Sequence, residues 1–547
     1  MYNGQDMSGL SGRGRLRAAL TGAFLGLGVM LVGVAGAFAP QPAAAQSFPA
    51  FRVALAEGVA PHPALAAYYR ETGFAPVWTG AEHAARRTAL VSALAGAADH
   101  GLPAARYDLP GLLAAFEAVE SERDRGFVEA RASLAFVQYA RDISSGVLSP
   151  RGLVEQIVRE LPRPDVTQLM RDFAAAEPVA FIRNLAPHAP EYARLLHARR
   201  ALEAQITQGG WGPQVPTGAL RPGESGEAVI ALRNRLIAMG YMPRVATARY
   251  DGAMQRAVQA FQIAHGLEPD GLAGRDTLAA INVEPEARLR AITVALERER
   301  WLNIDRGERH IWVNLTDFHA RIVDHDRVTL ETRAVIGAQQ RDMQTPEFSH
   351  RMTYLELNPD WTLPRSIVAR SYWNGLANGG HRYLQIIDAR GRVVPREAID
   401  FTQYTPRNFP FQLRQPPGPS NPLGQVKFMF PNPWAIYLHD SPARQLFRTT
   451  VRTHSSGCVR LHDPEAFAYE LLSRQSADPV SLYQSTLRRG NLQRIYLDDP
   501  VPIHLVYRTA FTSVDGEMNY RSDVYGRDAR LYEALRAAGV ETQPAQS

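Results

Sequence analysis

The chain has 547 residues, more than one hydrophobic core usually serves, so two to four domains are expected. The hydrophobic fraction of 45% and the charged fraction of 21% are ordinary for globular protein. The net charge is only +5 and no long Lys/Arg block interleaves with aromatic residues, so no nucleic-acid partner is expected. A single cysteine excludes an intramolecular disulfide and a zinc site built on several thiolates.

Residues 1–45 predict a secretory signal peptide. A polar, Arg-containing start is followed by the apolar run Ala18 to Ala39 and by the small-residue cleavage site Ala43-Ala44-Ala45. An uncleaved anchor is the alternative, because about 20 apolar residues can span a bilayer. With either outcome the bulk of the chain is exported to the periplasm, and it is tied to the membrane only if the signal remains.

Residues 46–205 predict a helical scaffold domain rich in Ala, Leu and Arg. We expect the aromatic residues Tyr68, Tyr69 and Trp78 to pack in its core rather than bind a ligand. Helical spacing is clearest in Pro63 to Arg70, Arg86 to Ala98 and Arg131 to Ile143.

A Gly- and Pro-containing linker, 206–220, leads to a compact unit at 221–283 with three predicted helices. Its G-x-x-G-x-x-V-x-x-L opening, its Phe261-Gln262 pair and its D-G-x-x-G-x-x-T-L ending from Asp270 resemble the peptidoglycan-binding type 1 module. That resemblance implies a three-helix bundle that binds cell-wall polymer. The same residues could also report the fold of the bundle alone.

From about 305 to 510, alternating and β-branched residues predict a mostly-β domain. Residues 366–425 interrupt it with many Gly and Pro residues, and an insertion of this length is usually a functional lid or cap. The polar C-terminal tail, 511–547, receives no assignment.

Cys458 is a candidate nucleophile, and His439, His454 and His462 are its candidate bases. His439 ends an apolar run, and Cys458 begins the next strand-like run. Neighbouring strands lie about 5 Å apart, which makes His439 the preferred base. Asp440 can orient the His439 ring through its backbone carbonyl or its carboxylate.

The Ser-Ser-Gly turn before Cys458 predicts an oxyanion site made by the N–H groups of Gly457 and Cys458. Strand alternation places Ser456 and Arg460 on the face of Cys458, where the guanidinium of Arg460 suits a substrate carboxylate. Tyr437 shares the face of His439 by the same alternation.

Two other interpretations stand beside this one. By composition alone, a single Cys is more often a buried small hydrophobic residue than a nucleophile. A zinc site formed by the three histidines and Cys458 is conceivable, but its spacing matches no zinc-binding pattern.

The segment resembles the L,D-transpeptidase family with a YkuD-type catalytic domain. The signature of that family is a His and, after a gap in the sequence, the motif [S/T]-H-G-C-x-R. Here the segment runs from His439 to Ser455-Ser456-Gly457-Cys458-Val459-Arg460, with Ser456 where most members have His. This variant is similar to the large YcbB-like branch. The further stretches that carry this likeness are Gln344-Thr345-Pro346, Asn358-Pro359-Asp360-Trp361, Pro364-Arg365-Ser366-Ile367, the run from Asn421 to Asn432, and Tyr437-Leu438-His439-Asp440.

The resemblance implies a multidomain α+β protein: a mostly-β catalytic domain with a capping insertion, a three-helix peptidoglycan-binding module and a helical scaffold. It implies Cys458 as nucleophile, His439 as base and Asp440 as the residue that orients the base, without metal or other cofactor.

The implied reaction is acyl transfer between peptidoglycan stem peptides through a Cys458 thioester, giving 3→3 cross-links, with carbapenem-type β-lactams as inhibitors. Three alternatives remain open. The thioester could pass to water, as in an L,D-carboxypeptidase, or to a lysine of a wall-anchored protein. The chain could also be a wall-binding protein without activity.

Overall fold

The protein is described here by a computed structural model that covers residues 49–513 and 515–542. The predicted signal segment, 1–45, lies outside the described residues. Over the range that is described, no helix is both long enough and apolar enough to cross a membrane.

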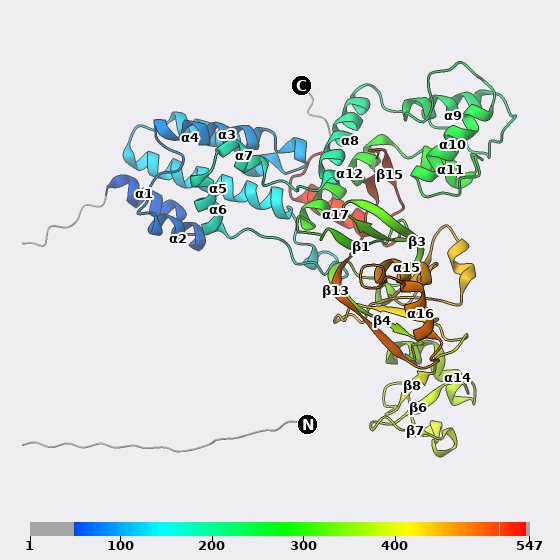
Figure 1. Cartoon of the computed structure of the whole chain (residues 1–547). Coiled ribbons are helices and arrows are strands. Elements are labelled where there is room, and N and C mark those ends of the chain that lie inside the picture. The colour runs from blue at the N-terminus through cyan, green and yellow to red at the C-terminus, as the bar shows by residue number, and fades with distance from the viewer. Residues whose placement is uncertain (1–48, 514, 543–547) are drawn as a thin grey trace, which may run out of the picture. The chain divides into compact units, whose positions relative to one another are not determined.

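The N-terminal part is a helical domain arranged around α5 (Glu122–Ser145). A reciprocal capping box at Ser121 and Asp124 begins this helix, since each side chain accepts the backbone N–H of the other. Figure 1 shows the surrounding helices. They are α1 (Ala50–Val59), α2 (Pro63–Glu71), α3 (Ala84–Ala95), α4 (Leu109–Glu117), α6 (Val166–Ala175) and α7 (Pro178–Arg183). The next helix, α8 (Pro190–Thr207), packs along α12 (Pro285–Trp301).

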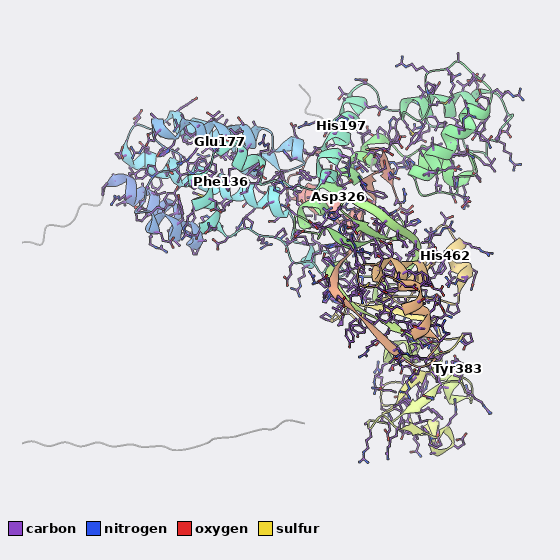
Figure 2. All side chains as sticks on the ribbon, viewed as in Figure 1. Phe136, Glu177, His197, Asp326, Tyr383 and His462 are labelled. Carbon is purple, nitrogen blue, oxygen red and sulfur yellow. The ribbon has the colours of Figure 1, made fainter. Side chains whose placement is uncertain are left out.

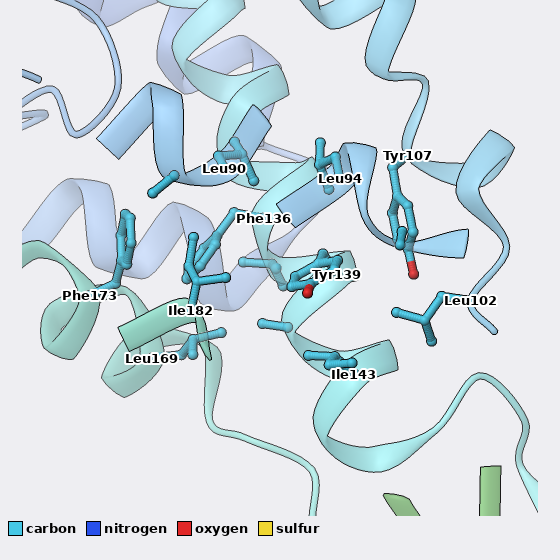
Figure 3. Close-up of a cluster of buried hydrophobic side chains, with 14 of the residues drawn as sticks. Leu90, Leu94, Leu102, Tyr107, Phe136, Tyr139, Ile143, Leu169, Phe173 and Ile182 are labelled. Atoms are coloured by element: carbon cyan, nitrogen blue, oxygen red, sulfur yellow. The ribbon is translucent and has the colours of Figure 1, made fainter. Parts of the chain in front are cut away.

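Aromatic residues form the centre of this domain (Figure 3). The Phe136 ring lies 4.4 Å from that of Phe173 and 5.4 Å from that of Trp78, measured between centroids. Trp78, Tyr68 and Tyr69 are all buried, which confirms their predicted place in the core.

The next unit is a three-helix bundle of α9 (Glu227–Ala238), α10 (Gly252–Ala264) and α11 (Arg275–Ile281). Its core includes Leu232 and Phe261, both fully buried. The Gln262 amide donates to Asp270 at 2.8 Å and accepts the Gly271 N–H at 2.8 Å. The Phe-Gln pair of the sequence motif therefore stabilises the bundle itself.

Helix α12 (Pro285–Trp301) then leads into the β domain. In the described chain, nine strands follow the order β11-β3-β12-β10-β9-β4-β13-β1-β2, and β2 also pairs with β3, so the sheet closes on itself. The strands are β1 (Arg309–Asn314), β2 (His319–Asp324), β3 (Arg327–Gly337), β4 (Phe348–Leu357), β9 (Val426–Met429), β10 (Leu438–His439), β11 (Thr453–Ser455), β12 (Val459–Leu461) and β13 (Gln493–Val506).

One face of this sheet is the core of the β domain. Phe428, Leu438 and Val459 lie on this face and are fully buried. Helices α15 (Pro464–Leu472) and α16 (Pro479–Leu487) follow β12 and contribute Phe467 and Tyr483 to the same core. The opposite face of the central strands is left for polar side chains.

The insertion between β4 and β9 is more regular than its sequence suggests. It contains α14 (Trp373–Ala377) and a four-stranded sheet in the order β5-β8-β6-β7, with a hydrophobic core of its own that includes Leu376 and Leu413. Figure 2 labels Tyr383 in this insertion, where its side chain is exposed. The strands are β5 (Trp361–Thr362), β6 (Gln385–Ile387), β7 (Val393–Val394) and β8 (Gln412–Gln415).

The C-terminal segment is an ordered part of the fold. It forms a hairpin of β14 (Ala510–Thr512) and β15 (Met518–Tyr520), followed by α17 (Arg527–Ala537). Leu531 and Leu535 of α17 pack with Trp301 in a small core. This helix was not predicted from the sequence, because only a few of its side chains are apolar.

Candidate active site

Two short parallel strands bring Cys458 and His439 together. β10 pairs with β12 in the register Leu438 with Val459 and His439 with Arg460. One step earlier in this register, Tyr437 lies across from Cys458, and its carbonyl accepts the Val459 N–H at 3.1 Å. The four polar or reactive side chains therefore share one face of the sheet, opposite the apolar core.

His439 is buried, with 4% of its surface exposed, and its tautomer follows from its contacts. Nδ1 lies 2.5 Å from the backbone carbonyl of Asp440. A carbonyl can only accept, so Nδ1 carries the proton and Nε2 keeps a free lone pair. Burial, reinforced by Arg460, lowers the pKa of His439 to about 3, which keeps the imidazole neutral.

The carboxylate of Asp440 does not contact His439. Its Oδ1 accepts the Ser441 N–H at 2.6 Å and an Arg444 N–H at 3.0 Å, while Oδ2 accepts the Gln425 N–H at 2.9 Å. The sequence allowed Asp440 to orient His439 through its backbone carbonyl or its carboxylate, and the structure has the contact through the carbonyl. The carboxylate instead holds the neighbouring loops.

Cys458 directly precedes β12 and is partly exposed. Its Sγ lies 3.6 Å from the carbonyl of Ala435, and in the part of the chain that the structure describes no hydrogen bond joins it to His439. Burial raises the pKa of the Cys458 thiol, while Tyr437 acts in the opposite direction. Both members of the pair are thus neutral at rest.

The turn before Cys458 differs in one respect from the sequence-based expectation. The Gly457 N–H donates to Ser455 Oγ at 3.1 Å, so this group is already used within the turn. The Cys458 N–H donates to no acceptor among residues 49–513 and 515–542. Gly457 has φ of +121°, a conformation that favours glycine, and Ser456 is exposed.

Arg460 is a partly buried cation beside the thiol. Within the described residues its guanidinium donates to no acceptor, and its Nε is buried. Burial lowers the pKa of Arg460, and the nearby Cys458 opposes that shift. The arrangement suits an anionic ligand that accepts hydrogen bonds.

The other candidate bases lie at the surface. His454 is exposed and faces Thr449, while His462, labelled in Figure 2, contacts the Asp463 carboxylate at 2.9 Å. Among the described residues, no three His, Cys, Asp or Glu side chains lie in metal-binding geometry.

Lys427 is a site residue that the sequence analysis missed. It lies opposite His439 on β9, contacts Glu356 at 2.8 Å, and places Nζ 4.6 Å from the ring centre of Tyr437. A signal was available, because Lys427 is the only lysine in the sequence.

Asn432 was also missed, since nothing in its residue type relates it to Cys458. Its side-chain oxygen accepts the N–H groups of Trp434 and Ile436, at 3.1 and 3.2 Å. These contacts hold the loop in which Ala435 has φ of +52° and turns its carbonyl to Cys458.

Family profiles match three parts of the chain. They are a scaffold domain at 63–198, a "Putative peptidoglycan binding domain" at 225–281 and an L,D-transpeptidase catalytic domain of the YkuD type at 308–488. Residues 308–488 of the chain therefore match the catalytic domain of the YkuD-type L,D-transpeptidases.

A curated protein of Haemophilus influenzae, named "Putative L,D-transpeptidase", is 28% identical over 243 residues. The match covers 44% of this chain and 48% of that protein, so it spans about half the length of the relative.

Two solved L,D-transpeptidase structures are also similar. The one from Xylanimonas cellulosilytica is 18% identical, covering 54% of this chain and 98% of that chain, with a TM-score of 0.17. The one from Stackebrandtia nassauensis is 14% identical, covering 54% and 96%, with a TM-score of 0.20.

Proposed function

We propose that the protein is a peptidoglycan L,D-transpeptidase that forms 3→3 cross-links through a thioester on Cys458. The observation that carries the proposal is the adjacency of β10 and β12, which places Cys458 and a correctly protonated His439 on one face. Asp440 serves this pair through its backbone carbonyl.

In the first half-reaction, His439 Nε2 takes the thiol proton as Cys458 Sγ attacks the carbonyl of the third stem residue. The Cys458 N–H stabilises the oxyanion. The bond to the terminal D-alanine then breaks, and its amine leaves with the proton held by His439. Arg460 binds a substrate carboxylate.

In the second half-reaction, the side-chain amine of a diamino acid on a neighbouring stem attacks the thioester. His439 takes the proton from this amine and returns a proton to the departing sulfur. A new amide bond replaces the C–S bond, so the enzyme is regenerated without metal or other cofactor.

Water competes with the acceptor amine for the thioester, so the insertion at 366–425 has a function in this scheme. Its core packs against Tyr437, which also contacts the core of the catalytic domain. We propose that the insertion caps the bound stem and limits hydrolysis.

The proposed polymer and location follow from the same assignment. The module at 225–281 holds glycan or stem peptides near the site, which requires export to the periplasm by the N-terminal segment. Carbapenem-type β-lactams should acylate Cys458, since they present a strained acyl group to the same nucleophile.

The test is mass spectrometry of products formed from a disaccharide-tetrapeptide by wild type and Cys458→Ala. We expect cross-linked dimers from wild type and none from the variant. Dimers that persist in Cys458→Ala would overturn the mechanism. Tripeptide monomer as sole product would support an L,D-carboxypeptidase, and binding to sacculi without turnover would support a wall-binding protein. Product attached only to an added lysine-containing acceptor peptide would support protein attachment.

A further inference from the structure

A buried threonine holds the turn that carries the nucleophile. Thr345 Oγ1 donates to the carbonyl of Gly457 at 2.7 Å and accepts the Gly337 N–H at 2.9 Å. The Gly457 carbonyl and the Cys458 N–H belong to one planar trans peptide group and point in opposite directions. Fixing the carbonyl on one side therefore fixes the direction of the N–H on the other side.

The backbone of Thr345 is held in turn by the C-terminal segment. The Tyr525 hydroxyl donates to the Gly337 carbonyl at 2.5 Å and accepts the Thr345 N–H at 3.4 Å. The Arg527 guanidinium donates to the Thr345 carbonyl at 2.8 Å. Tyr525 thus joins Gly337, at the end of β3, to the backbone of Thr345, and Arg527 binds the same backbone at its carbonyl.

Buried charges anchor Arg527. Its Nη1 contacts Glu347 at 2.9 Å, and Glu347 also binds Arg298 of α12 at 2.5 Å. Arg298 also forms an ion pair with Asp528 at 2.7 Å, so the network ends on the same C-terminal segment that carries Arg527. All four side chains are at least nine-tenths buried, so each charge depends on its partners and the arrangement resists movement.

Tyr525 is anchored independently of these charges. Its ring stacks on that of Tyr507, with centroids 5.7 Å apart and planes 19° apart. The Tyr507 hydroxyl accepts the Tyr525 N–H at 2.8 Å and donates to Asp523 at 2.5 Å. Asp523 also accepts the Arg527 N–H at 2.9 Å, so the segment is fixed on both sides of Tyr525.

We infer that residues 523–528 position the catalytic turn: Tyr525 and Arg527 hold Thr345, and Thr345 directs the Cys458 N–H toward the reacting carbonyl. This segment lies beyond the matched catalytic-domain residues 308–488. The inference rests on the proposed function for its catalytic consequence. The effect of Tyr525 and Thr345 on the rigidity of the turn does not depend on that function.

The test compares full-length wild type with Tyr525→Phe, which keeps the stacked ring and removes only the hydroxyl. The matched control is Tyr532→Phe on α17, whose hydroxyl bonds Thr542 at 2.7 Å and contacts neither Thr345 nor Gly337. Thr345→Val, which keeps the shape of the side chain, should reproduce the effect of Tyr525→Phe. The readouts are hydrogen exchange of the peptide covering 455–460, thermal stability, and kcat and KM for dimer formation.

We expect Tyr525→Phe to speed exchange at 455–460 by about fivefold or more, as local opening becomes easier. We expect kcat to fall about tenfold at unchanged KM, less than the full loss of an oxyanion donor. Tyr532→Phe should change neither quantity. Unchanged exchange in Tyr525→Phe would overturn the inference, and so would faster exchange with unchanged kcat.

Failure of the proposed function gives a different result. Wild type would then form no dimers, and exchange at 455–460 would alone decide the inference. Exchange that rises in Tyr525→Phe and Thr345→Val but not in Tyr532→Phe would support it, and equal exchange in all proteins would refute it.

Discussion

At the scale of single residues, burial sets the resting state of the site. It lowers the pKa of His439 to about 3 and raises that of the Cys458 thiol. Both shifts favour uncharged forms, so a thiolate–imidazolium pair is not the resting state. In the proposed mechanism, proton transfer to Nε2 of His439 therefore accompanies the attack on the substrate.

This resting state predicts the pH dependence of thiol alkylation. The rate with iodoacetamide should rise with pH and reach its midpoint above the ordinary thiol pKa of about 8.5. His439→Gln should leave that midpoint nearly unchanged while it abolishes turnover. A plateau of fast alkylation between pH 5 and 8 that disappears in His439→Gln would contradict the neutral pair.

Arg460 predicts a separate effect on substrate binding. Arg460→Met should raise KM by roughly 10- to 100-fold, the range expected when a hydrogen bond to a charged group is lost. Arg460→Lys should recover little, because an ammonium lacks the planar fork. Arg448→Met removes an exposed cation from the segment between His439 and Cys458 and serves as the control. Equal KM values for wild type and Arg460→Met, measured on a tetrapeptide donor, would exclude this contact.

At the scale of elements, the site depends on which strands become neighbours. β11 lies between His439 and Cys458 in the sequence but pairs with β3, whereas β10 and β12 pair directly. Alternation along each strand predicted that Tyr437 shares a face with His439 and that Arg460 shares a face with Cys458, and the pairing of β10 with β12 joins the two faces. The contact between the strands comes from apolar burial of Leu438 and Val459 on the opposite face.

Helix α5 of the scaffold domain carries a buried carboxylate, Glu129, with 0% of its surface exposed. It accepts hydrogen bonds from the N–H groups of Val77 at 2.6 Å and Thr79 at 2.8 Å, and from the Tyr69 hydroxyl at 2.9 Å. These contacts join α5 to α2 and to the segment that follows α2.

Glu129→Gln should destabilise the scaffold domain by about 1–3 kcal/mol, because an amide cannot accept at both of its ends. Glu117→Gln, an exposed substitution on α4, should change the stability by less than about 0.5 kcal/mol. Urea unfolding followed by tryptophan fluorescence measures both. Equal midpoints for the two variants would show that the Glu129 contacts add nothing.

At the scale of the whole molecule, buried neutral histidines link folding to pH. Burial lowers the pKa of His504 to about 3, as it does for His439. In the unfolded chain each of these two histidines binds a proton near pH 6.5, whereas in the folded chain it does so only near pH 3. Stability is therefore fully present above pH 6.5 and declines as the pH falls toward 3. Asp528, whose pKa burial raises to about 6, acts in the opposite direction over part of this range.

His504→Gln tests this linkage. The amide keeps a donor for the Arg306 carbonyl, which His504 Nε2 contacts at 3.1 Å. The free energy of unfolding lost between pH 6.5 and 5 should shrink by about 1.5 kcal/mol in this variant. Urea unfolding at both pH values measures the difference, and the same pH dependence in both proteins would be evidence against it.

Residue patterns in the sequence were sufficient for the local features of this protein. Helical periodicity predicted the scaffold and the three-helix module, and β-alternation predicted the strands, because both patterns reflect burial on one side of an element. The Ser-Ser-Gly-Cys segment and the upstream His predicted a nucleophile and a base by residue type, and these roles stay predictions. The predicted use of the Gly457 N–H as an oxyanion donor does not match the structure, because this N–H donates to Ser455 Oγ within the turn.

Contacts between distant segments depend on the tertiary structure, because no local pattern encodes them. The pairing of β10 with β12, the choice of the Asp440 carbonyl over its carboxylate, and the contact of Lys427 with Tyr437 belong to this group. So do the hydrogen bonds from Tyr525 and Arg527, about 180 residues along the chain from Thr345. Their partners meet only when the core assembles, since apolar burial sets which segments approach and buried polar groups then select their geometry.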